Sequence, residues 1–302
     1  MPSCGSAMTD GTQQGGMFTR IVVFLEMIKF SHTIFALPFA LSGALLAAGG
    51  LPSARQLFWI VLAMAGARTA AMGLNRLIDA DIDARNPRTA GRAIPAGLIS
   101  KGFTLVFIMI SLALLLLAAG QLNRLCLLLS PLAVFFLVLY SYCKRFTSLA
   151  HVVLGICLAA APIGAWVAIR GGIEPPPLIL GGAVLFWVAG FDILYALQDL
   201  EFDRAAGLHS IPVALGVSGS LWAARLFHLV MLGLLLGLAA TMNLGGFFLA
   251  GVVATTAMLF YEHWLLRDGD LGKLDAAFFN MNGYISLVIL LCTALEVLTK
   301  RP

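Results

Sequence analysis

Two short acidic segments, at 75–83 and 192–203, carry side chains suited to chemistry. Together they hold seven of the chain's 15 acidic residues. On a helix, residues four apart lie on one face, so each segment presents a stripe of oxygen-bearing side chains. The stripes consist of Asn75, Asp79 and Asp83 in the first segment and of Tyr195, Asp199 and Asp203 in the second.

These stripes suit a hard divalent cation. Mg²⁺ in proteins takes one or two carboxylates and fills its other positions with water and phosphate oxygens. Neither stripe contains His or Cys, which argues against zinc, iron or copper. The stripes therefore predict a diphosphate bridged by Mg²⁺ ions, which Asn75, Asp79, Asp83, Asp199 and Asp203 would hold.

Basic residues near the acidic segments fit the same ligand. Arg88 and Arg92 follow the first segment, Arg204 follows the second, and Lys144 and Arg145 lie in a loop between two apolar runs. Guanidinium groups match phosphate oxygens, and Lys supplies a point charge. We predict that these five residues bind diphosphate, although each also fits a simple anchor in a positively charged loop.

Apolar helices must position these groups. The chain of 302 residues is 60% hydrophobic and 11% charged, a composition typical of membrane proteins. A helix of about 20 apolar residues crosses about 30 Å of hydrocarbon. Nine runs of that kind predict an all-α, polytopic membrane bundle with about nine transmembrane helices. The runs cover residues 21–48, 56–78, 103–120, 124–142, 148–169, 177–198, 218–240, 246–266 and 276–297.

The positions of Lys and Arg predict the orientation of this bundle. If the N-terminus is inside, ten loop Lys and Arg residues lie on the inner side and five on the outer side, and cytoplasmic loops carry the excess. The prediction is an inner-membrane protein with a cytoplasmic N-terminus and a cytoplasmic active site. The net charge of +4 then reflects topology and gives no case for nucleic-acid binding.

The sequence predicts one catalytic domain. Residues 1–16 are rich in Gly, Ser and Thr and are predicted to be a disordered or non-native tail, whereas residues 17–302 form a single transmembrane domain. The five cysteines are scattered without a close pair. Both acidic segments end an apolar run with Asp-x-x-x-Asp, four runs apart, which suggests an internal duplication.

The acidic segments and their flanks resemble the UbiA prenyltransferase superfamily. Its first motif has the form Asn-x-x-x-Asp-x-x-x-Asp, and its second ends in Asp-x-x-x-Asp. The stretch from Arg68 to Gly97 is similar to the family signature throughout. The stretch from Tyr195 to Pro212 resembles the 4-hydroxybenzoate polyprenyltransferase-like subgroup. The resemblance covers almost the whole chain after Met17.

This resemblance implies a UbiA-type fold and an enzyme of quinone biosynthesis, for ubiquinone or menaquinone. Such an enzyme uses Mg²⁺ to move a polyprenyl group from a polyprenyl diphosphate to an aromatic acceptor through an allylic cation. Tyr195 would stabilise the cation or shape the pocket, and Arg68, Asp192 and His209 would contact the acceptor. No obligate protein partner is expected.

Several alternatives remain open. The acceptor is either of the 4-hydroxybenzoate type or a futalosine-derived aromatic compound, as in MqnP-type enzymes. Ubiquinone-type members tend to carry Lys where this chain has His209. A membrane cation transporter is the alternative from another class, since carboxylates within membranes also mark cation pathways. Transport sites, however, lie near the midplane on interrupted helices, whereas these acids end apolar runs.

Overall fold

The chain is a bundle of helices. The computed structural model describes residues 16–27, 36–266 and 274–300, and within those ranges it contains helices and loops but no strand. Eight of the described helices are long and apolar enough to cross a membrane, which confirms the predicted fold class. Their bounds are α3 Ala54–Ile78, α5 Lys101–Leu122, α6 Arg124–Cys143, α7 Ala150–Arg170, α8 Pro175–Ala196, α10 Ile211–Thr241, α11 Gly246–Leu265 and α12 Leu274–Thr299.

The first predicted span, 21–48, corresponds to two helices instead of one. Helix α1 covers Met17–Met27 and α2 covers Leu37–Ala48, while residues 28–35 lie outside the described ranges. The 12 residues of α2 rise about 18 Å at 1.5 Å each, less than the thickness of the hydrocarbon layer. Pro38 in the first turn of α2 fits a helix that begins here, because Pro is tolerated only where no helical donor is needed.

Short polar residues set the other helix boundaries. Ser53 and Gln56 form a reciprocal capping box at the start of α3. The side chains of Ser100, Asn123 and Ser210 accept backbone hydrogen bonds at the starts of α5, α6 and α10. Helix α10 therefore begins well before the predicted 218, and it bends at Gly216, where φ is 67° and ψ is −175°.

Both acidic segments contain the same local break. Helix α3 ends at Ile78, Asp79 has φ −89° and ψ 0°, and the short α4 (Ala80–Asp83) follows. Likewise α8 is followed by the 3₁₀ turn η2 (Leu197–Asp199), Asp199 has φ −100° and ψ 2°, and α9 (Leu200–Ala205) follows. The first stripe is thus not on one continuous helix. Its spacing survives because the Asp79 amide donates to Asn75 O and the Asp83 amide donates to Asp79 O.

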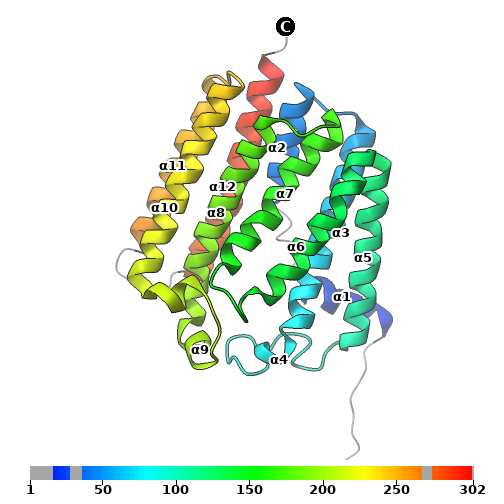
Figure 1. The fold of residues 1–302 in the computed structure, drawn as a ribbon, viewed down its shortest axis with the longest axis vertical. Helices are drawn as coiled ribbons and strands as arrows, with labels where there is room; N and C mark the ends of the chain where they lie inside the picture. The colour runs from blue at the N-terminus through cyan, green and yellow to red at the C-terminus, as the bar shows by residue number, and fades with distance from the viewer. Residues whose placement is uncertain (1–15, 28–35, 267–273, 301–302) are drawn as a thin grey trace, which may run out of the picture.

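The packing order brings these two breaks to one end of the molecule. Helix α3 packs on α5, α8 packs between α7 and α10, and α2 packs on α7 and α12. In Figure 1, α4 and α9 lie side by side at the bottom of the bundle, and the C-terminus is at the top. Trp187 at the centre of α8 is fully buried against Phe39 and donates a hydrogen bond to Asn282. One core therefore fixes α8, which carries the second acidic segment.

The close approach of α7 and α8 depends on Gly155. A Cβ at this position would lie 2.5 Å from Leu185 O. Gly155→Ala is therefore expected to force the helices apart and to destabilise the protein by about 1–3 kcal/mol. Thermal unfolding in detergent should show a lower midpoint.

Gly164 on the same helix is the matched control, since no atom lies within 4 Å of its added Cβ. Gly164→Ala should leave the midpoint unchanged or raise it slightly. Equal midpoints for the Gly155 and Gly164 variants would contradict the close packing of α7 on α8.

Candidate active site

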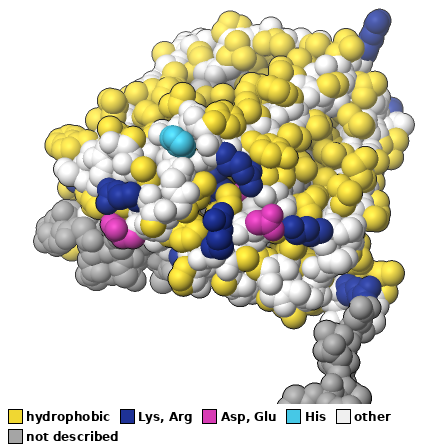
Figure 2. Space-filling view, turned by 60° about the horizontal axis from the view of Figure 1, so that its bottom comes forward, with side chains coloured by type: hydrophobic (Ala, Val, Ile, Leu, Met, Phe, Trp, Pro, Cys, Tyr) yellow, Lys and Arg dark blue, Asp and Glu magenta, His cyan; other side chains and the backbone are white. Residues whose placement is uncertain are grey.

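A cavity of about 1340 Å³ opens between α3, α6, α7 and α8 and reaches the two acidic segments. Its polar end collects the charged side chains, and its walls further along are apolar, with Leu132, Phe136, Leu158 and Leu178 among them. Figure 2 shows Lys and Arg side chains gathered on the end of the molecule where the segments lie. The cavity thus joins a charged mouth to an apolar interior.

The first acidic segment is held by cations. Lys144 Nζ lies 2.7 Å from Asp79 Oδ2, and Arg145 Nη2 lies 3.5 Å from Asp79 Oδ1. Arg92 Nη1 donates to both oxygens of Asp83 at 2.7 Å. Asn75 Nδ2 donates to Asp79 Oδ2 at 3.0 Å. The stripe predicted from the spacing therefore exists as a bonded cluster.

The second acidic segment is tied to the first by Arg88. Its guanidinium donates Nε to Asp199 Oδ1 at 2.8 Å and Nη2 to Asp199 Oδ2, and Asn86 adds a hydrogen bond of 2.9 Å to Oδ1. Arg88 also lies over the Tyr195 ring, 5.5 Å from its centroid. Arg88 and Asn86 follow the first motif, so the two acidic segments face each other across the mouth of the cavity.

The electrostatic environment differs among these acids. Burial raises the pKa of Asp79, which is 2% exposed, although the charge and hydrogen bond of Lys144 oppose that effect. Asp81, two residues away, is exposed, and a hydrogen bond from Lys101 lowers its pKa. Asp79 thus lines the cavity, whereas Asp81 lies on the surface.

The residues present fit a Mg²⁺–diphosphate ligand better than a metal held by protein alone. Within the described residues, no group of three or more His, Cys, Asp or Glu side chains is close enough to hold a metal ion. Mg²⁺ needs only one or two carboxylates when phosphate and water complete its shell. Asp79 Oδ1 is buried and accepts no hydrogen bond from a described residue. A buried oxygen of this kind on a hard donor set is consistent with an additional ligand.

Most of the predicted site residues line the cavity, and two do not. The lining includes Arg68, Asn75, Asp79, Asp83, Arg88, Arg92, Lys144, Asp192, Tyr195, Asp199, Asp203 and His209. Arg145 lies behind this wall, where it donates to Ile78 O at 2.7 Å. Arg204 is exposed and lies 3.6 Å from Glu201. The predicted diphosphate roles of Arg145 and Arg204 stay predictions.

The lining also contains polar residues that were not predicted as site residues, among them Arg76, Asn86, Tyr140 and His151. Arg76 donates to Asn75 Oδ1 at 3.3 Å, which orients the Asn75 amide. His151 Nδ1 lies 2.6 Å from Asp192 Oδ2. A signal for Asn86 and Arg76 existed, since both adjoin the acidic segment. No motif spacing marked Tyr140 on α6 or His151 on α7, although the stretch that contains His151 resembles the family.

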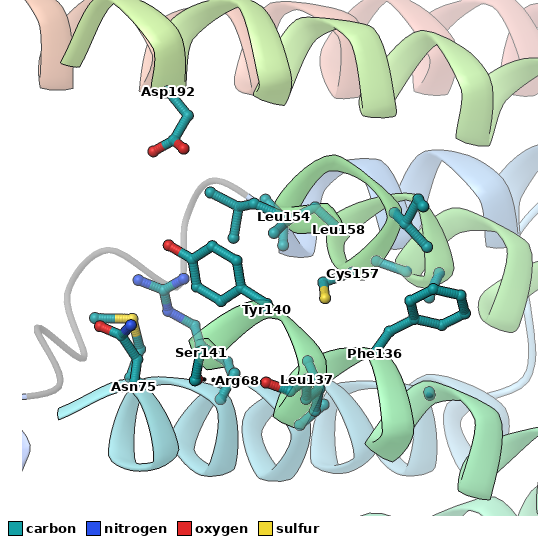
Figure 3. A pocket seen from close by; sticks show the side chains of 18 of the residues that line it. Arg68, Asn75, Phe136, Leu137, Tyr140, Ser141, Leu154, Cys157, Leu158 and Asp192 are labelled. Carbon is teal, nitrogen blue, oxygen red and sulfur yellow. Dashed lines mark hydrogen bonds between the residues drawn. The ribbon is translucent and has the colours of Figure 1, made fainter. Parts of the chain in front are cut away.

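The middle of the cavity is lined by groups from opposite helices. Figure 3 shows Arg68 and Asn75 on α3, Tyr140 on α6 and Asp192 on α8, all pointing toward the same space. The Nε atom of Arg68 is buried and has no hydrogen-bond partner among the described residues. This part of the cavity can therefore accept a polar ligand that presents an anionic group to Arg68.

The comparisons with known proteins agree with this geometry. The model of the UbiA prenyltransferase family matches residues 36–284. The chain belongs to the UbiA prenyltransferase family. It is a prenyltransferase and a multi-pass membrane protein.

Curated relatives and a solved structure resemble this UbiA-family chain over most of their length. The 4-hydroxybenzoate octaprenyltransferase of Vibrio cholerae is 30% identical over 249 residues, 81% of this chain and 86% of that protein. The Aliivibrio fischeri protein of the same name is 28% identical over 84% of this chain and 88% of its own. The UbiA homologue of Aeropyrum pernix is 32% identical, with a TM-score of 0.81 over 89% of this chain and 98% of its own.

Proposed function

We propose that this UbiA-family enzyme transfers a polyprenyl group from a polyprenyl diphosphate to a phenolic acid of the 4-hydroxybenzoate type. The proposal depends most on one observation, the contact of Arg88 with Asp199 that joins the two acidic segments over one cavity. A charged mouth suits the diphosphate, and apolar walls suit the polyprenyl tail. The names of the curated relatives support the acceptor class.

The chain's cations are expected to hold the diphosphate. Arg88, Arg92 and Lys144 line the mouth, and each now contacts a carboxylate. When a diphosphate binds, its oxygens take over these contacts, because they offer the same bidentate acceptor geometry. Asp79, Asp83, Asp199 and Asp203, with Asn75, are then free to hold Mg²⁺. Bound Mg²⁺ would supply positive charge that stabilises the departing diphosphate.

Tyr195 and the apolar walls surround the space where the donor carbon and the acceptor would react. The Tyr195 ring lies beside Arg88 at the mouth, where it can face the allylic cation that forms as diphosphate departs. The apolar walls exclude water, so the cation meets the acceptor before it meets a water molecule. A UbiA homologue from Archaeoglobus fulgidus, 21% identical, is bound to GPP and Mg²⁺. That complex supports the donor and the metal proposed for this chain.

We assign the acceptor carboxylate to Arg68. Because its buried Nε has no described partner, Arg68→Gln should raise KM for 4-hydroxybenzoate about 10- to 100-fold, the loss expected for a charge-assisted hydrogen bond. Initial rates at saturating donor measure this. Arg55→Gln, at the opposite end of α3, is the control and should leave KM unchanged. An unchanged KM in Arg68→Gln would place the carboxylate elsewhere.

The acceptor and the metal are tested together in an assay of purified protein. Wild-type enzyme with a polyprenyl diphosphate and Mg²⁺ is expected to prenylate 4-hydroxybenzoate, to stop in EDTA and to recover in excess Mg²⁺. Prenylation of a futalosine-derived acceptor alone would assign the alternative acceptor. Cation flux across vesicles without any prenylation would favour transport instead.

The proposed orientation places the mouth of the cavity on the cytoplasmic side of the inner membrane. Most loop Lys and Arg residues lie at this end of the bundle, as the positive-inside rule requires. In a cysteine-free background, a thiol introduced by Arg85→Cys should react with a charged reagent only in inside-out vesicles. A thiol introduced by Arg55→Cys should react only in right-side-out vesicles, and the reverse pattern would invert the topology.

A further inference from the structure

A buried His–Asp pair lies in the wall of the cavity, between α7 and α8. His151 at the start of α7 is 4% exposed, and its Nδ1 lies 2.6 Å from Oδ2 of Asp192 on α8. The two helices are in close contact, as Gly155 shows, so the pair is held on a rigid part of the scaffold. Both residues line the cavity.

The partner of Asp192 differs from the partners of three motif acids. Asp79, Asp83 and Asp199 each contact a Lys or Arg side chain. Asp192 contacts an imidazole instead. Among the described residues no Lys or Arg side chain forms an ion pair with Asp192, so its carboxylate is open to a ligand in the cavity.

The two nitrogens of the His151 ring have different surroundings. Nδ1 faces Asp192, whereas Nε2 is buried and has no hydrogen-bond partner within the described part of the chain. A hydrogen on Nδ1 meets a carboxylate acceptor, but a hydrogen on Nε2 would be a buried donor without one. We therefore assign the donor to Nδ1, where it fixes the orientation of the Asp192 carboxylate.

The Asp192 carboxylate faces the space where an acceptor would lie. Its side chain is 20% exposed and points into the cavity from α8, opposite Arg68 on α3 (Figure 3). Its Oδ1 accepts no hydrogen bond from a described residue. Tyr140 lies in the same space. An acceptor with its carboxylate on Arg68 thus presents its opposite end, the hydroxyl group, toward α8.

We propose that Asp192 is the base that accepts the hydroxyl proton of a phenolic acceptor, and that His151 is the positioning residue that orients it. The inference rests on the proposed function. As the donor's carbon–oxygen bond breaks, its electron pair leaves on the diphosphate. The ring carbon beside the hydroxyl forms the new bond while the hydroxyl proton moves to Asp192, giving a neutral dienone. The proton on that ring carbon then passes to the diphosphate, and Asp192 returns its proton to the oxygen.

The test compares variants on two phenols of different acidity. Asp192→Asn keeps the size of the side chain but removes the base, and it should lower kcat for 4-hydroxybenzoate about 10²-fold without changing KM for the donor. With 3-fluoro-4-hydroxybenzoate, whose hydroxyl ionises more readily and which keeps one free ring carbon beside it, the loss should shrink to about 10-fold. His151→Leu should lower kcat less than Asp192→Asn does, and its loss of kcat should again be smaller with 3-fluoro-4-hydroxybenzoate than with 4-hydroxybenzoate. His151→Gln, whose amide can still donate, should restore most of kcat.

Asp81→Asn is the control and should behave as wild type with both phenols. If Asp192→Asn does not fold, as judged by gel filtration, the His151→Leu and His151→Gln comparison decides. Equal losses with the two phenols, or an Asp192→Asn variant as active as wild type, would overturn the assignment of the base. A wild-type enzyme that prenylates no phenol would instead overturn the proposed function.

Discussion

Replacing Asp79 or Asp199 by Asn should lower the rate of prenyl transfer about 10²- to 10³-fold, the usual cost of removing one charged group that stabilises a transition state. Each carboxylate lines the mouth of the cavity and contacts a cation that we assign to the diphosphate. The two residues lie on different helices, yet the effects should be similar because both serve one ligand. Initial rates of polyprenyl transfer in Mg²⁺ measure the effect.

Asp81→Asn is a closely matched control for this prediction. Asp81 lies between Asp79 and Asp83 in the sequence, but its side chain is 87% exposed and contacts Lys101. Its replacement should leave the rate unchanged. If the Asp79 or the Asp199 variant folds and keeps full activity, that residue does not hold the metal.

Arg88→Ala is the second change with a large expected effect, a loss of about 10²-fold in kcat/KM for the polyprenyl diphosphate. The guanidinium contacts Asp199 through two nitrogens and lies over Tyr195, so its removal takes a charge from the diphosphate and frees Asp199. Arg88→Lys should recover only part of the loss, because an ammonium group cannot reproduce the planar fork.

Arg85→Ala provides the comparison for Arg88. Arg85 is exposed, lies three positions earlier and donates only to the backbone oxygen of Asp81 among the described residues. Its loss should leave kcat/KM unchanged. Equal effects of the two substitutions would mean that only the net charge of this loop matters, and would contradict a specific role for Arg88.

The sequence predicted the acidic segments well because their spacing is local. Asp79 and Asp83 are linked by backbone hydrogen bonds along one short stretch, and the helical period is enough to place them on one side. The breaks at Asp79 and Asp199 have no such signal in the amino-acid pattern, so a continuous helix was expected. The start of α2 at Leu37, inside the first apolar run, has no signal in hydropathy either, since hydropathy measures how apolar a run is and not where a helix begins.

Contacts between segments that are distant in the chain could not be predicted from the sequence. Arg88 and Asp199 are 111 positions apart, and His151 and Asp192 are 41 apart on two helices whose relative rotation depends on packing at Gly155. A lone His on an apolar helix is more often a packed core residue than a functional one, so His151 gave no reason for selection. Arg204 shows the opposite case, since it adjoins the second motif but points to the surface.

The most direct test of the central claim is an experimental structure with Mg²⁺ and a non-reactive polyprenyl thiodiphosphate. We expect that Arg88 leaves Asp199 for the diphosphate, and that metal density lies between the carboxylates that follow α3 and those that follow α8. A diphosphate bound at only one of these clusters, with the Arg88–Asp199 contact intact, would contradict the claim.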